Sequence, residues 1–156
     1  MKHSIFAAIL LAGTTGLTLA EDKVKKHPER EDVAGIDSKD PEMIAAQKKA
    51  RDTLMTFVRA IQRPEANKRY LLKVKITEGG ETEHVWLEPV KWNDPGLLGR
   101  LAVEPVAIKK HKKGDIIAPL PDEVSDWVIL SKDGAKQGGY TTDVVEKRET
   151  ESAKEK

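Results

Sequence analysis

Residues 70–90 restrict the fold of this chain more than any other stretch, because they alternate in polarity around two adjacent glycines. The segment "YLLKVKIT" leads into "EGGE", and "TEHVWLEPV" leads back, which is typical of a β-hairpin with Gly79 and Gly80 at its tip. The register pairs apolar residues on one face: Leu72 with Leu87, and Val74 with Val85. That apolar face requires a second layer to cover it.

A helix that precedes the hairpin can supply this layer. Asp40 suits the N-cap, Pro41 suits the first turn, and Pro64 ends the pattern. Apolar side chains recur at three- and four-residue steps along one stripe: Met43, Ala46, Ala50, Leu54, Phe57 and Ile61. The spacing therefore predicts one amphipathic helix that packs on the sheet.

Beyond the hairpin, turn residues separate short apolar runs. We expect a loop over residues 91–99 and a glycine bulge at Gly138 and Gly139 that leads into a last strand. Further strands are predicted at residues 105–108, 116–120 and 126–130. The fold class is therefore α+β, with one N-terminal amphipathic helix packed on a small curled antiparallel β-sheet or partial barrel.

The first twenty residues have the pattern of a secretory signal peptide. Lys2 precedes an apolar run over residues 5–11, and the small residues Thr18 and Ala20 suit cleavage after Ala20. An uncleaved membrane anchor is the alternative, but glycines and threonines end the run well short of the roughly 20 apolar residues that a spanning helix needs. The sequence thus predicts a periplasmic or secreted protein with no stable membrane insertion after cleavage.

The composition indicates one domain with charged ends. The chain has no cysteine, so packing rather than disulfides must hold an exported form of it together. Its 27 Lys and Arg residues nearly balance its 26 Asp and Glu residues, which argues against a nucleic-acid partner. Residues 21–39 and 146–156 are rich in charge and poor in large apolar side chains, which predicts a disordered linker and a disordered tail. A single α+β domain is expected at residues 40–145.

Several short motifs occur in the order found in one bacterial family. They are "ARDTLMTF" (50–57), "VK" (74–75), "EHVWL" (83–87), "LG" (98–99), "GD" (114–115), "SDW" (125–127) and "GGYT" (138–141). Over nearly all of residues 43–141 the chain resembles the YegJ-like proteins, catalogued as domain of unknown function 2314. The segment "KKHKK" (109–113) is more basic than is usual in that family, and the charged C-terminal tail extends beyond the domain. The resemblance implies an α+β domain and brings no activity or catalytic residues.

No motif in the sequence carries a specific chemistry. With only two histidines in the domain, His84 and His111, and no cysteine, we expect no metal site and no cofactor. Ser125 and Ser131 lie in no nucleophile elbow. The residues favour a non-catalytic binding or interaction module of the bacterial envelope. The alternative is an envelope-associated hydrolase that uses carboxylate and histidine residues, with at least two of these in one pocket: His84, Asp115, Asp126 and Tyr140.

The outward face of the hairpin is the first candidate binding surface. Strand alternation places Lys73, Lys75, His84 and Trp86 on this face. An exposed Trp86 between lysines and a histidine could stack on a small ligand or anchor an envelope protein. Alternatively, the sheet curls and this face closes over a second small core that buries Trp86.

Asp126, Trp127 and Tyr140 complete the set of candidate binding residues. Trp127 belongs to a strand that is apolar on both faces, and such strands are usually buried. The side chain of Asp126 is suited to bond free amides of the preceding turn, which would make both residues structural. In the other interpretation, Trp127 is a wall of a binding groove and Tyr140 follows two glycines that let a ligand approach the backbone.

Overall fold

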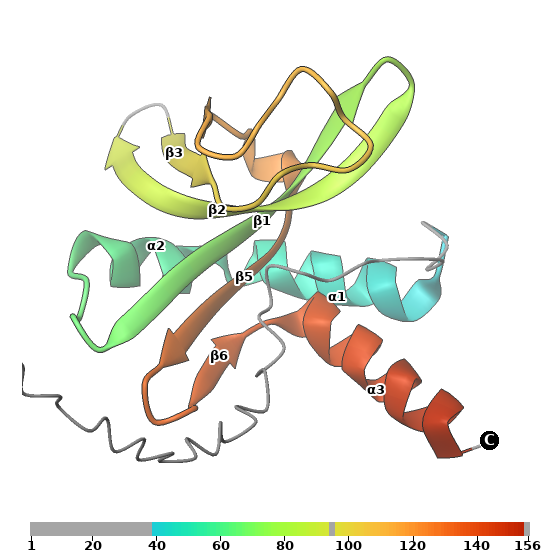
Figure 1. The fold of residues 1–156 in the computed structure, drawn as a ribbon. Coiled ribbons are helices and arrows are strands. Elements are labelled where there is room, and N and C mark those ends of the chain that lie inside the picture. Colours follow the sequence, from blue (N-terminus) through green and yellow to red (C-terminus); the bar gives the residue numbers. More distant parts are fainter. Residues whose placement is uncertain (1–38, 94–95, 155–156) are drawn as a thin grey trace, which may run out of the picture.

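The computed structural model describes residues 39–93 and 96–154 (Figure 1). Helices α1 (Pro41–Asp52) and α2 (Leu54–Gln62) are followed by β1 (Lys68–Glu78), β2 (Glu81–Asn93), β3 (Gly96–Leu101) and β4 (Ile116–Ile117). A 3₁₀ turn, η2 (Pro121–Glu123), then leads to β5 (Val124–Ser131), β6 (Lys136–Gly138) and α3 (Tyr140–Lys154). The predicted signal peptide and linker, up to residue 38, lie outside the described residues.

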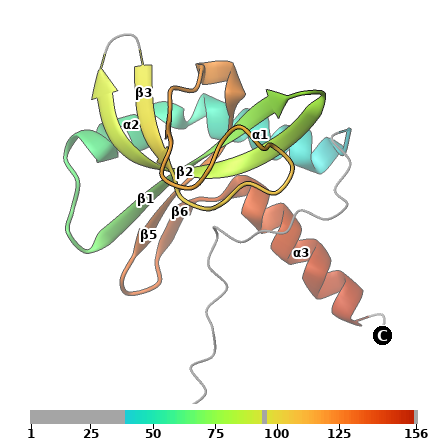
Figure 2. The same cartoon turned by 45° about the horizontal axis from the view of Figure 1, so that its top comes forward.

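The strands form one open antiparallel sheet in the order β4-β3-β2-β1-β5-β6. Helices α1 and α2 run along one face of it, and we call this the helix face (Figure 1). The segment between β3 and β5 passes over the β1–β2 hairpin (Figure 2). The α+β class is confirmed, and the sheet does not close into a barrel.

The β1–β2 hairpin has the predicted register. Leu72 pairs with Leu87 and Val74 with Val85, while on the other face Lys73 pairs with Trp86 and Lys75 with His84. The two glycines of the tip both have positive φ, as the turn requires. Local sequence therefore determines this part of the sheet.

The prediction of one continuous helix needs correction. The helical stretch divides at Thr53, whose hydroxyl donates to the carbonyl of Lys49 at 2.7 Å and whose backbone departs from helical values. A threonine hydroxyl that bonds back to the preceding turn commonly bends a helix. Asp40 caps α1 by accepting the N–H of Met43 at 2.9 Å. The single predicted helix is thus two helices, and α3 is a third.

The main core lies between these helices and the sheet. Phe57 of α2 packs against Trp127 of β5, with ring centroids 5.8 Å apart. The indole N–H of Trp127 donates to the carbonyl of Ala50 at 3.1 Å, so the tryptophan joins α1 to the sheet. The rest of the core comes from β1, β2, β3, the segment after β3, and β5: Leu72, Val74, Val85, Leu87, Leu97, Leu101, Ile108, Val124 and Ile129.

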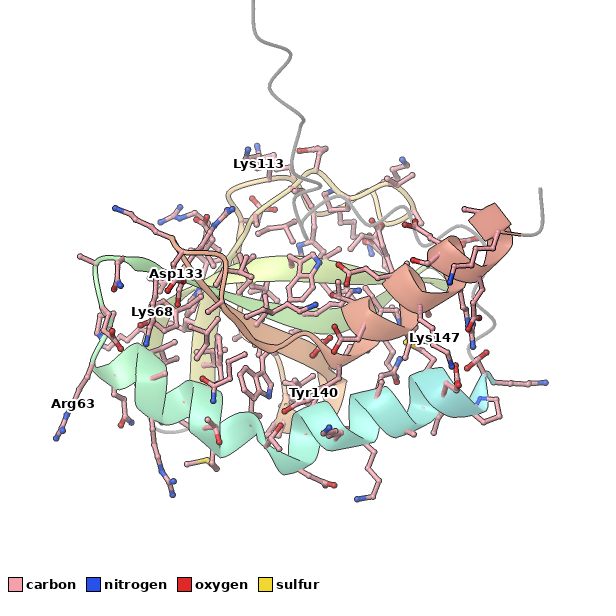
Figure 3. The ribbon with its side chains drawn as sticks, turned by 90° about the horizontal axis from the view of Figure 1, so that it is seen from below. Arg63, Lys68, Lys113, Asp133, Tyr140 and Lys147 are labelled. Atoms are coloured by element: carbon pink, nitrogen blue, oxygen red, sulfur yellow. The ribbon has the colours of Figure 1, made fainter. Side chains whose placement is uncertain are left out.

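The C-terminal part of the chain differs most from the sequence prediction. Residues 146–154, expected to lie in a disordered tail, form the later turns of α3. Lys147 bonds Glu42 of α1 at 2.9 Å, and Arg148 pairs with Asp40. Figure 3 shows Lys147 directed from α3 toward α1. Ion pairs with a distant helix, rather than an apolar stripe, hold this part of α3.

Four of the predicted strand and loop assignments are also wrong. Residues 105–108 are not a strand, and residues 116–120 contribute only the two-residue β4. Most of residues 91–99, predicted as a loop, belong to β2 and β3. Gly138 and Gly139 lead into α3 instead of a last strand. No helix among the described residues is long and apolar enough to cross a membrane.

Candidate functional site

The predicted site residues divide between the two faces of the sheet. Lys73, Lys75, His84, Trp86 and Asp126 lie on the face opposite α1 and α2, which we call the outer face. The remaining two, Trp127 and Tyr140, have their rings on the helix face, 5.9 Å apart. The structure therefore brings five of the seven residues together and separates the other two from them.

Trp86 is buried, which agrees with the alternative in which the outer face closes over a second small core and not with an exposed tryptophan. Its side chain is 2% exposed and packs with Leu71, Ala102 and Val128 in a second, smaller core. Within residues 39–93 and 96–154, its indole N–H has no hydrogen-bond partner. The outer face is thus a packed layer around Trp86, and of its predicted residues Lys75 is exposed and His84 is half-buried.

A buried polar cluster lies beside Trp86, and Asp126 is its centre. The Asp126 carboxylate is fully buried and accepts the N–H of Trp127, the N–H of Tyr140, and both the N–H and hydroxyl of Thr141. The last three donors belong to the first turn of α3, whose free amides need acceptors. Asp126 therefore fixes α3 to β5, and the structural interpretation of this residue holds with different partners from those expected.

Lys73 completes the cluster from β1. It faces Asp126 across the β1–β5 ladder and is 3% exposed. Its ammonium group lies 3.5 Å from the Thr141 hydroxyl and 5.1 Å from the centroid of the Trp86 ring. Burial raises the pKa of Asp126, against the lowering effect of the bonds from Thr141 and Trp127 and of the nearby Lys73 charge. The cluster is thus a network of closely paired groups.

His84 joins the edge of this network. Its Nδ1 lies 2.6 Å from the hydroxyl of Ser125, the residue at which the β1–β5 register shifts. Burial, together with the charges of Lys73 and Lys75, lowers the pKa of His84 to about 4. The imidazole is therefore neutral at pH 7. Ser125 is itself 3% exposed, so this contact does not present a nucleophile to the surface.

The depressed pKa of His84 predicts a loss of stability in mild acid. Unfolded His84 binds a proton near pH 6.5 and folded His84 only near pH 4, so the unfolded state binds more protons in between. The free energy of unfolding is therefore higher above pH 6.5 than at about pH 4. For His84 this difference is on the order of 2 kcal/mol after allowing for its partial exposure, and it is lost as the pH falls through this range. Urea unfolding at pH 7 and near pH 4 should show a smaller loss for His84→Gln than for the parent. Equal losses would contradict the prediction.

The residues proposed for the hydrolase alternative do not converge. Asp115 accepts the N–H of Lys112 in the loop before β4, and His84 contacts Ser125. Tyr140 reaches Asp126 through its backbone N–H, while its hydroxyl lies 3.3 Å from that of Thr53. Within residues 39–93 and 96–154, no three His, Asp or Glu side chains are grouped so that they could hold a metal ion.

A surface groove lies elsewhere, where the sheet splits. The β1–β2 ladder ends at the Leu72–Leu87 pair, after which the start of β1 stays with β5 and the end of β2 stays with β3. Continued pairing would place Tyr70 opposite Pro89, which has no N–H to donate. The register of β2 also shifts between Pro89 and Lys91. The two strands therefore diverge and leave a groove between them.

The groove has a volume of about 320 Å³ and is bordered by α2, β1 and β2. Its walls are mainly apolar and aromatic: Ile61, Pro64, Tyr70, Pro89, Val90 and Trp92. Trp92 is 37% exposed, in contrast to the buried Trp86 and Trp127. Charged side chains also border it: Lys68, Arg69, Glu88 and Lys91. Concave sites of this kind, apolar with a few polar groups, are typical binding sites.

Sequence reasoning missed the groove although one signal was available. The predicted hairpin register already set Tyr70 against Pro89, and a proline inside a ladder commonly ends the pairing. The stretch from Val90 to Trp92 was instead assigned to the hairpin end and a loop. Val90 and Trp92, two apolar residues just after Pro89, could have indicated an exposed surface where the pairing ends.

Comparison with known proteins gives a family and no activity. Residues 40–156 match the family described as "Uncharacterized protein conserved in bacteria (DUF2314)". The chain is also 29% identical over 101 residues to the "Uncharacterized protein YegJ" of Escherichia coli (strain K12), which covers 65% of each protein. No solved structure matches the chain.

Proposed function

Since this chain belongs to the DUF2314 family of uncharacterized bacterial proteins, we propose from its own geometry that it is a non-catalytic binding module of the bacterial envelope. The groove between α2 and the split strands is its binding site. Its partner is an envelope protein or a small ligand.

The observation that supports this proposal is the exposed aromatic groove. Of the three tryptophans, two are in cores and Trp92 borders the groove. An aromatic side chain left partly exposed in a concave site is a common anchor for a ligand or partner. By contrast, the buried polar cluster is occupied with holding α3 on the sheet.

The envelope location rests on the N-terminal sequence pattern. A short apolar run after Lys2 and small residues before Glu21 favour export and cleavage after Ala20. The absence of cysteine is compatible with an exported domain held by packing alone.

The test is capture of a partner by the exported protein. We expect protein recovered from the periplasm to have the intact mass of a chain that begins at Glu21. Immobilised, it should retain an envelope component that the Trp92→Ala variant loses by about tenfold or more, as for an interface hot spot. Leu120→Ala is the matched control, since Leu120 is 60% exposed and does not border the groove. Equal capture by the parent and the Trp92→Ala variant would exclude the groove as the site.

A further inference from the structure

Backbone groups that border the groove show what kind of ligand it fits. The carbonyl of Trp86 accepts the N–H of Ala102, so it points to the β3 side of β2. Because backbone polar groups alternate in direction along a strand, Pro89 points the other way, toward β1. Leu87, next to Trp86, therefore points toward β1 and faces Leu72. The N–H and C=O of Leu72, and of Tyr70 two residues away, thus point toward β2.

Tyr70 and Pro89 therefore face each other across the groove without forming a ladder pair. By this alternation, the N–H and C=O of Tyr70 and the C=O of Pro89 supply one donor and two acceptors along its walls, outside the β1–β2 ladder of the described residues. Strand groups that lie outside a ladder can pair with an added strand. An extended peptide presents its own N–H and C=O groups at strand spacing, and so can bond to Tyr70.

The charges at the rim indicate the side chains of such a peptide. Lys68 bonds Glu65 at 2.6 Å, and Arg69 bonds Glu88 at 3.1 Å across the split. Lys91 also borders the groove, and no carboxylate pairs with it in the described part of the chain. Two carboxylates, Glu65 and Glu88, thus balance two of the three cations that line the groove, and the charge of Lys91 is left as a net +1. A carboxylate on the ligand would complement this rim.

We infer that the groove binds an extended peptide segment in which acidic and apolar residues alternate. The peptide pairs with the backbone of Tyr70, packs an apolar side chain on Trp92 and places a carboxylate near Lys91. This inference rests on the proposed function and specifies its partner. The added strand would lie between β1 and β2, where the ladder ends.

Binding of defined peptides to the mature protein tests the inference. The probe is a short labelled peptide that alternates glutamate with valine, compared by fluorescence anisotropy with its lysine–valine counterpart. Two further peptides have the glutamate–valine sequence with N-methyl groups on alternate amides. One phase carries them on the glutamate amides and the other phase on the valine amides. We expect the lysine peptide to bind at least tenfold more weakly, and one N-methylated phase to lose binding.

Charge reversal on the protein supplies the matched control. Lys91→Glu should reverse the preference between the two peptides, whereas Lys113→Glu should leave it unchanged, because Lys113 does not border the groove. The inference is overturned if both N-methylated phases bind like the parent peptide or if Lys91→Glu has no effect. A saccharide or lipid captured through Trp92 would also overturn it while the proposed function stands. Capture independent of Trp92 would refute both.

Discussion

Asp126→Ala should abolish most of the stability of the domain, at a cost of roughly 3 to 5 kcal/mol in the free energy of unfolding. The substitution removes one buried carboxylate and leaves three backbone N–H groups and the Thr141 hydroxyl without their acceptor. It also leaves the buried Lys73 without the opposite charge beside it in the ladder. Two of the affected amides begin α3, so that helix should separate from the sheet first.

Denaturant unfolding followed by circular dichroism measures this effect. Asp126→Asn is the informative companion, because an amide keeps one acceptor oxygen and should cost less than alanine. Asp143→Ala controls for the loss of a carboxylate on α3, since Asp143 makes an exposed ion pair with Lys136 and should cost at most about 1 kcal/mol. If Asp126→Ala were as stable as Asp143→Ala, the capping role assigned to Asp126 would be wrong.

Gly138→Ala should be the second severe change, with a cost of roughly 3 kcal/mol or more. A Cβ at this position would lie 2.2 Å from the backbone oxygen of Trp127 and 2.6 Å from its ring. Neither group can move easily, because Trp127 packs on Phe57 and bonds Ala50. The φ of Gly138 is also +76°, which an alanine adopts only with strain.

Gly134→Ala separates the two parts of this cost. Gly134 has a φ of +91° in an exposed turn, and a Cβ there would have no atom within 4 Å. It should therefore show only the backbone cost, about 1 to 2 kcal/mol. Thermal unfolding of both variants gives the comparison. Similar losses for the two would mean that the close approach to Trp127 is not what requires glycine at position 138.

Short-range patterns predicted the parts of the fold that depend on neighbours in sequence. The alternation around Gly79 and Gly80 was sufficient for the β1–β2 register, because a two-residue loop fixes which residues face each other. The stripe from Met43 to Ile61 predicted a helical layer, but the break at Thr53 depends on a side-chain bond that periodicity does not reveal. Too many strand residues were predicted after β3, because the backbone of an apolar segment there bonds to a carboxylate that is distant in sequence.

Glu83 illustrates this last point. Its carboxylate accepts the N–H groups of Val106, Ala107 and Ile108, so this segment forms an irregular loop instead of a strand. Nothing near residue 106 in the sequence indicates such a partner. Likewise, the residues of α3 after Val145 lack large apolar side chains, and their contacts with α1 join residues more than a hundred positions apart.

Only part of the candidate site was predicted, because the rest of it also depends on residues that are distant in sequence. Alternation correctly placed Lys73, Lys75, His84 and Trp86 on one face, but whether that face is open depends on β5, α3 and the segment after β3. The groove arises where β1, β2 and α2 meet. Only its cause, a proline opposite Tyr70, was present in the local sequence.

The bond between Asp126 and α3 also has a consequence for the order of folding. Strand β5 pairs directly with β1 near the middle of the sheet, yet the acceptor it carries is satisfied by residues 14 and 15 positions further along. On a ribosome, whose tunnel still encloses the newest residues, β5 emerges while α3 is hidden. Docking β5 at that moment would bury a carboxylate without its donors, which is strongly unfavourable. The nascent chain should therefore remain loosely structured around β5 until α3 has also left the tunnel, and acquire its native packing there only after that.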